Sequence, residues 1–221
     1  MIAKDIISEE MPSVRTSDTG LEALNWMTFF KVSHIPIVNN KFFLGLLSEN
    51  DIYDLNNPEE PIGNHNLSLF KAYVLPTQHI YEILEVASRL KLSIIPVVDD
   101  NKEYQGIIKL TDLLHEFAKV SAIEKPGGII VLEVHVNDYS VSEIAQIIES
   151  NNAKVLSLYI LTIPDSVRLE VHIKVNVSDI TSILQTFNRY EYEIKASHLE
   201  MDKQDELYNA RYELLMRYLN T

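Results

Sequence analysis

The feature of this sequence that most constrains its fold is an internal repeat of about 60 residues. Residues 34–38 recur as residues 94–98, each with a proline among apolar residues. A glycine follows in each copy, Gly45 and Gly106, and an aspartate stands six residues after each glycine, Asp51 and Asp112. A half-module of this size cannot bury its own apolar faces, so the two copies are expected to pack against each other.

Each copy reads as a short extended piece, a helix, two strands joined by a polar turn, and a last helix near the aspartate. The first helix is expected to begin after Ser17 or Asp18 in one copy and after Thr77 in the other, because these residues favour N-caps. Residues 56–67, rich in Asn, Pro, Glu and Gly, read as the linker between the copies.

The chain beyond residues 125–128 is not a third copy. It reads as strand, helix, strand, strand, helix and strand, a ferredoxin-like β-α-β-β-α-β unit. Its third strand, residues 167–175, alternates strictly between apolar and polar residues, which indicates an antiparallel sheet with one covered face. Residues 203–218 form a further helical pattern, which covers its own domain or makes a dimer contact.

Composition narrows the function classes. The net charge is −13, which disfavours nucleic acid as a partner, and the absence of cysteine excludes disulfides and thiolate metal sites. The start of the chain lacks a signal peptide, and no window is apolar enough to span a membrane, so we expect a cytoplasmic protein. The histidine spacing predicts no metal site.

The chain is predicted not to be an enzyme. It contains no G-x-S-x-G, no P-loop and no G-x-G-x-x-G pattern. No group of His, Ser and Asp in the sequence suggests a nucleophile with its base.

The duplicated pattern of a proline among apolar residues, followed by a glycine and an aspartate, resembles a tandem pair of CBS domains. The C-terminal part resembles an ACT domain, and the whole arrangement is similar to acetoin-utilisation-like CBS proteins. The resemblance implies a mixed α+β and α/β fold: a duplicated β-α-β-β-α pair followed by the ACT-like unit and a C-terminal helix. The expected boundaries are CBS repeats at 1–56 and 68–120, the ACT-like domain at 127–200 and the helix at 201–221.

The resemblance implies an adenosine-containing ligand between the repeats. It gives Ser48 a contact to phosphate or ribose and Asp51 a contact to the ribose hydroxyls. The second copy keeps Asp112 but has Lys109 where Ser or Thr is usual. The residues expected to bind nucleotide are Thr16, His34, Pro36, Ser48, Asp51, Pro96, Lys109 and Asp112.

A structural interpretation of the same residues remains open. Ser48 and Asp51 also have the spacing of a capping box, which needs no ligand. If a nucleotide binds, the acidic chain favours an AMP-like ligand over a triphosphate. ADP, ATP and S-adenosylmethionine are the other regulatory candidates, and no cofactor is required.

Two functions follow. The first is a regulatory protein, expected to be a homodimer, whose repeats change their arrangement when the adenosine ligand binds. The second is a ligand-free scaffold that acts through dimerisation or an unknown protein partner, which Lys109 favours. In the ACT-like part, residues 137–141 lack the glycine that brings backbone to a bound amino acid, so a structural or dimerising role is favoured there.

Overall fold

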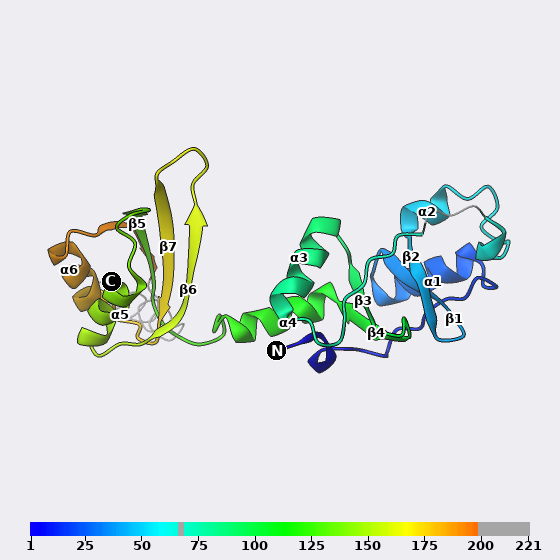
Figure 1. Cartoon of the computed structure of the whole chain (residues 1–221), viewed down its shortest axis with the longest axis horizontal. Helices are drawn as coiled ribbons and strands as arrows, with labels where there is room; N and C mark the ends of the chain where they lie inside the picture. The colour runs from blue at the N-terminus through cyan, green and yellow to red at the C-terminus, as the bar shows by residue number, and fades with distance from the viewer. Residues whose placement is uncertain (66–68, 199–221) are drawn as a thin grey trace, which may run out of the picture. The chain divides into compact units, whose positions relative to one another are not determined.

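The computed structural model describes residues 1–65 and 69–198 (Figure 1). The chain divides into two units, Met1–Phe117 and a second that begins at Ala118. Each unit is considered by itself below. The C-terminal helix predicted at 201–221 lies outside the described residues.

The first repeat contains α1 (Gly20–Phe30), β1 (His34–Asn39), β2 (Phe42–Ser48) and the short α2 (Glu49–Tyr53). Thr19 is the N-cap of α1, and it forms a capping box with Glu22, so the expected starts at Ser17 or Asp18 were wrong by one or two residues. The strands β1 and β2 form an antiparallel hairpin. Asn40 and Lys41 form its turn with φ values of 47° and 73°, as a two-residue hairpin turn requires.

The second repeat contains α3 (Ile80–Leu90), β3 (Ile94–Val98), β4 (Tyr104–Lys109) and α4 (Leu110–Val120). His79, not Thr77, is the N-cap of α3, and it makes a capping box with Glu82. The hairpin of β3 and β4 has a longer turn than that of β1 and β2, with five residues between its strands instead of two.

The segment at the start of each repeat pairs with the second hairpin strand of the other repeat. Ser8 pairs with Ile107 of β4, with N···O distances of 2.8 and 3.1 Å, although residues 1–10 stand at the start of the first repeat in sequence. Phe70, from the segment before the second repeat, pairs in the same way with Leu46 of β2. A short 3-10 helix, η1 (Ala3–Asp5), also packs on the second repeat, and η2 (Ile62–Asn64) lies between the repeats in sequence.

Because each repeat packs against the leading segment of the other, a glycine is required at the repeated position. Gly106 has a φ of 138°, and a Cβ built on it would lie 2.6 Å from Ile7 Cγ2 and 3.0 Å from the Ser8 carbonyl oxygen. A side chain would therefore push the N-terminal segment away from β4. Gly45 is required for the same reason, because a Cβ built on it would lie 2.7 Å from the Cβ of Leu69.

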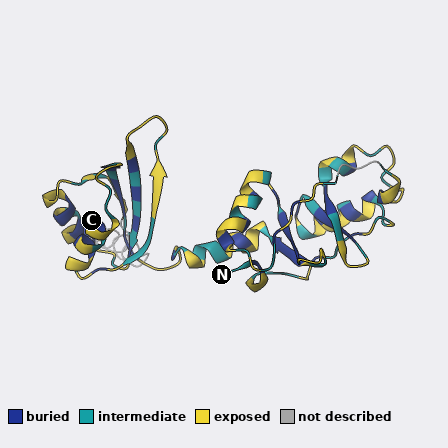
Figure 2. Cartoon of the chain, in the orientation of Figure 1, coloured by how far each residue is buried: buried dark blue, intermediate teal, exposed yellow. Residues whose placement is uncertain are grey.

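The core of the first unit consists of the strands and the inner faces of the helices, and Figure 2 shows these buried positions. One cluster belongs mainly to the first repeat and includes Ile94 and Ile107 from the second. A second cluster joins Ala3 to residues of the second repeat. The strand residues Ile35, Ile37, Ile95 and Val97 are fully buried, so the pattern around the two prolines marks core strands.

The second unit contains β5 (Ile129–His135), α5 (Val141–Ser150), β6 (Val155–Thr162), β7 (Arg168–Val175), α6 (Thr181–Arg189) and β8 (Glu193–His198). They follow one another in the predicted order. The antiparallel sheet has the strand order β6-β7-β5-β8, and α5 and α6 lie on one of its faces (Figure 1). Burial alternates along β7 as predicted, except that Val167 lies before the strand and is 65% exposed.

Candidate functional site

The two repeats meet through a polar cluster of Ser33, His34 and Ser93. Ser33 and Ser93 occupy equivalent positions just before β1 and β3. The Ser33 N–H donates to Ser93 Oγ at 3.0 Å, and the Ser93 N–H donates to His34 Nδ1 at 3.3 Å. Ser93 Oγ also lies 3.0 Å from His34 Nδ1. One histidine ring nitrogen therefore connects the first repeat to the second.

Burial lowers the pKa of His34 below its usual value of 6.5, and the nearby carboxylates of Asp51 and Glu49 oppose that shift. The neutral imidazole also suits the observed contacts, because Nδ1 can accept the Ser93 N–H only when it carries no proton. His34 thus supplies an acceptor at the junction rather than a fixed positive charge.

Ser48 and Asp51 lie beside this cluster, because Ser48 at the end of β2 pairs with His34 at the start of β1. Ser48 N–H and Ser48 Oγ donate to Asp51 Oδ2 at 2.8 and 2.6 Å, and Asp51 N–H donates to Ser48 Oγ at 3.2 Å. This is a complete capping box at the start of α2, so the structural interpretation of these two residues is realised. Asp51 is half-buried, and both of its contacts to Ser48 use Oδ2.

The second repeat differs at the matching positions. Lys109 Nζ pairs with Glu10 at 3.3 Å and lies 5.5 Å from the centre of the Phe30 ring, so it does not cap α4. Asp112 is exposed, and its carboxylate accepts a long bond from Thr111 Oγ1 at 3.4 Å. The Leu110 N–H bonds the Ser93 carbonyl just as the Glu49 N–H bonds that of Ser33, so the backbones correspond while the side chains do not.

The remaining predicted site residues are spread along the strands. Pro36 and Pro96 are buried within β1 and β3. Thr16 exchanges hydrogen bonds with Asn39, whose amide nitrogen lies 2.8 Å from Thr16 Oγ1, at the end of β1 opposite to His34. At about 3.3 Å per strand residue, Thr16 is roughly 16 Å from the Ser48 end. The structure therefore brings together His34, Ser48 and Asp51, but not Thr16.

Sequence reasoning missed Ser33 and Ser93 as members of the site. Their signal was present, because a serine stands at the same offset in both copies, immediately before the proline-containing strand. Serine is common before a strand, so only its recurrence at the same position of both copies could have indicated these two residues.

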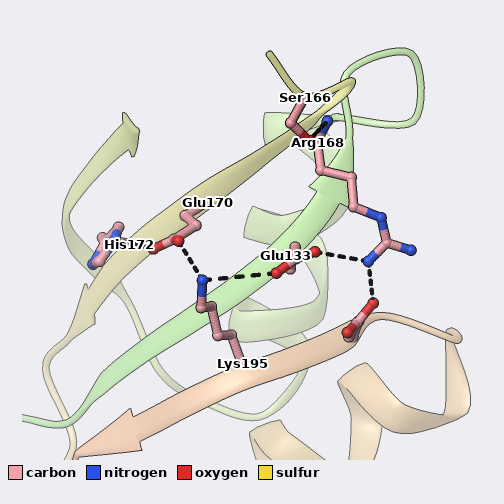
Figure 3. A network of polar contacts seen from close by, with 7 residues as sticks. Glu133, Ser166, Arg168, Glu170, His172 and Lys195 are labelled. Carbon is pink, nitrogen blue, oxygen red and sulfur yellow. Dashed lines mark hydrogen bonds and ion pairs between the residues drawn. The ribbon is translucent and has the colours of Figure 1, made fainter. Parts of the chain in front are cut away.

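A second polar network lies on the sheet of the second unit (Figure 3). Arg168 pairs with Glu133 at 2.8 Å and with Glu193, and Lys195 pairs with Glu170 and, at 3.8 Å, with Glu133. These contacts join β5, β7 and β8 across one face of the sheet. Arg168 donates hydrogen bonds to Glu133 and Glu193, which raises the pKa of Arg168. The hydrogen bond from Lys195 lowers the pKa of Glu170. The groups neutralise one another, which fits a cross-strand structural role.

Within residues 1–65 and 69–198, no group of three or more His, Asp or Glu side chains is placed to hold a metal ion. In the same part of the chain, no helix has both the length and the apolar character needed to cross a membrane.

Comparison with known proteins identifies the repeats. Residues 3–56 and 71–119 each match the family model described as the CBS domain. Inosine-5'-monophosphate dehydrogenase of Methanocaldococcus jannaschii is 26% identical over 133 residues, which cover 58% of this chain and only 26% of that protein.

Two solved structures are each similar to about half of the chain. A CBS domain pair/ACT domain protein from Thermotoga maritima has 23% identity and a TM-score of 0.49, covering 54% of this chain and 98% of its own. CBSX2, solved in complex with AMP, has 16% identity and a TM-score of 0.45, covering 54% and 97% of the two chains.

Proposed function

We propose, from the premise that this chain contains a tandem pair of CBS domains, that it is a regulatory protein that binds an adenosine-containing ligand between the repeats. The proposal assigns the binding to the first repeat, at His34, Ser48 and Asp51. It assigns no catalytic step to the chain.

The observation that carries the proposal is the position of Asp51 beside the junction of the two repeats. The capping box uses Oδ2, which leaves Oδ1 to accept hydrogen bonds from a ribose diol. His34 Nδ1 reaches Ser93 of the other repeat from the same end of β1. A ligand bound at this end would contact both repeats and would favour one arrangement of the pair by its difference in affinity for the two arrangements.

AMP is the favoured ligand. The net charge of −13 opposes a longer phosphate chain. The first repeat offers Asp51 and Glu49 near His34, and these carboxylates would repel additional phosphates. S-adenosylmethionine, ADP and ATP are the compounds against which this preference is measured.

The test is calorimetric titration of AMP into the wild-type chain and into Asp51→Asn. Asparagine keeps an acceptor oxygen for the capping box, whereas Asp51→Ala would also remove the acceptor for the Ser48 N–H. We expect Asp51→Asn to weaken AMP binding at least tenfold. The matched control is Asp112→Asn in the second repeat, which should leave the affinity unchanged.

Thermal unfolding gives the companion measurement. AMP at about 100 times its dissociation constant should stabilise the chain by roughly 2.7 kcal/mol, which corresponds to a shift of several degrees. Equal affinity of wild type and Asp51→Asn for AMP would remove the ribose role. No shift with AMP, ADP, ATP or S-adenosylmethionine would favour the second function.

That second function is a scaffold that associates as a homodimer. It is favoured by exposed apolar side chains on the helices of the pair, with Phe29 74% and Leu114 63% exposed. An apolar groove of about 460 Å³ between α3 and the start of α4 adds to this surface. A dimer mass by light scattering at micromolar concentration, lost in Phe29→Ser together with Leu114→Ser, is the expected result, and a monomeric wild type would contradict it.

For the second unit we propose an ACT-like module with a structural or dimerising role. The cavity next to the β5–α5 loop, about 270 Å³, is lined by Asp138, Glu143 and Glu193 among others. Its one lining cation, Arg168, already pairs with two glutamates. The acidic lining repels a carboxylate, and the β5–α5 loop lacks the glycine that would bring backbone N–H groups close to one, so calorimetry against the twenty amino acids should give no micromolar binding.

A further inference from the structure

A second cavity lies at the opposite end of β1 from Asp51, where Thr16 bonds Asn39. It encloses about 610 Å³, a size typical of small-molecule sites. Arg15, Lys41 and the Tyr104 side chain line it, and Tyr104 comes from the other repeat. The cavity therefore belongs to both repeats but does not include His34, Ser48 or Asp51.

The lining is cationic in an acidic protein. Arg15 and Lys41 have no ion-pair partner among the residues that the structure describes, whereas Lys109, Arg168 and Lys195 are paired. The described lining contains no Asp or Glu. The nearest carboxylate on the same loop, Asp18, accepts the Arg15 N–H at 2.8 Å and the Ser17 hydroxyl, and it lines a neighbouring depression instead.

The repeat itself supplies a comparison, because the same positions of the second copy lack this character. Asn39 and Asn40 correspond to Asp99 and Asp100. Arg15 corresponds to Leu75, and Tyr104 corresponds to Phe43. Only the hairpin lysine is common to both, as Lys41 and Lys102, each with a positive φ. The first copy thus presents cations and amides where the second presents two carboxylates.

We propose that this cavity binds the phosphate group of a small molecule. A phosphate carries nearly two negative charges and three strong acceptor oxygens, which match the guanidinium of Arg15 and the ammonium of Lys41. The phosphate belongs either to a nucleotide or to an inorganic phosphate compound. Asp51 does not line this cavity, so the phosphate site can be tested separately from the nucleotide site proposed above.

The test is calorimetric titration of inorganic pyrophosphate at constant ionic strength. Wild type is expected to bind it, and Lys41→Gln and Asn40→Asp are each expected to weaken binding about tenfold. Asn40→Asp introduces the carboxylate that the second repeat carries at this position. The matched controls, Lys102→Gln and Asp51→Asn, should leave the affinity unchanged.

Absence of pyrophosphate binding by wild type would overturn the site, and so would an equal loss in Lys41→Gln and Lys102→Gln, which would indicate a general charge effect. AMP titrated into protein saturated with pyrophosphate separates the two sources. Weakened AMP binding would mean that AMP occupies this cavity instead of the Asp51 site, and unchanged AMP binding identifies a separate phosphate compound as the occupant.

Discussion

The first repeat has His34 at the start of β1, where the second repeat has Ile94 at the start of β3. It has Ser48 before its last helix, where the second has Lys109. Histidine and serine make hydrogen bonds at the junction and at the helix start, whereas isoleucine is fully buried in the core. The strands that build the fold are alike in the two copies, so the differences concentrate at the strand ends.

The exchange of leading segments makes the two repeats depend on each other. This gives the largest expected effect, from deletion of residues 1–8. These residues begin the first repeat but make five backbone hydrogen bonds to the second, and Ala3 is fully buried there. We expect the deletion to lower the free energy of unfolding by about 4 kcal/mol.

Urea unfolding measures this loss, and amide exchange locates it. The Ile107 amide, which donates to Ser8, should exchange faster, while the Leu46 amide, which donates to Phe70, should change less. Lys4→Ala is the control, because its side chain is exposed, and it should be neutral. Unchanged protection of β4 would contradict the exchange of segments.

The next largest loss of stability is expected when the first residue of β1 is replaced by the isoleucine that stands at the start of β3. His34→Ile leaves the Ser93 N–H without its acceptor inside the junction. An unsatisfied, partly buried donor costs about 2 kcal/mol. Thermal unfolding measures the loss, and it should disappear in the background of Ser93→Pro, where the N–H is absent.

A smaller effect is expected at the helix start. Ser48→Ala removes the hydroxyl that caps α2 and should cost about 1 kcal/mol in a urea titration. Lys109→Ser builds the same spacing with Asp112 but removes the exposed pair with Glu10, so the net change should be a few tenths of a kcal/mol. Equal effects at the two sites would contradict the difference between the repeats.

The sequence predicted the strands better than the helix starts and the site. The apolar residues around Pro36 and Pro96 recur in register because the fully buried strands tolerate little else. The helix starts were misplaced because Thr19 and His79 form capping boxes with glutamates three residues later, and His79 is an unusual cap. Motif spacing brought Ser48 and Asp51 together, since both lie at one strand end.

What the sequence could not predict depends on contacts between distant segments. The pairing of Ser8 with Ile107 has no local signal beyond the glycine that it requires. The junction of His34 with Ser93 joins residues 59 apart. Thr16 was grouped with the nucleotide site, but its partner Asn39 holds it at the other end of β1. Residue type suggested a polar contact in each case, and only the fold determined the partner.

The smallest effect is the pH dependence of the same junction. Burial lowers the pKa of His34 in the folded chain below its unfolded value of about 6.5, so the unfolded chain binds the proton more readily. The stability that neutral His34 contributes is therefore fully present above pH 6.5 and is lost as the pH falls through the lowered value. Asp51 and Glu49 oppose the shift and keep the effect modest.

The contribution of His34 is isolated by comparing the melting temperatures of wild type and His34→Ile from pH 7.5 down to pH 5. The other carboxylates and histidines titrate in both chains, so their effects cancel in the difference. The difference between the two chains should shrink as the pH falls below about 6.5. A difference that stayed constant would mean that the pKa of His34 is the same in the folded and the unfolded chain. A difference that grew at low pH would mean that Asp51 and Glu49 outweigh burial, and that protonated His34 is the form that joins the repeats.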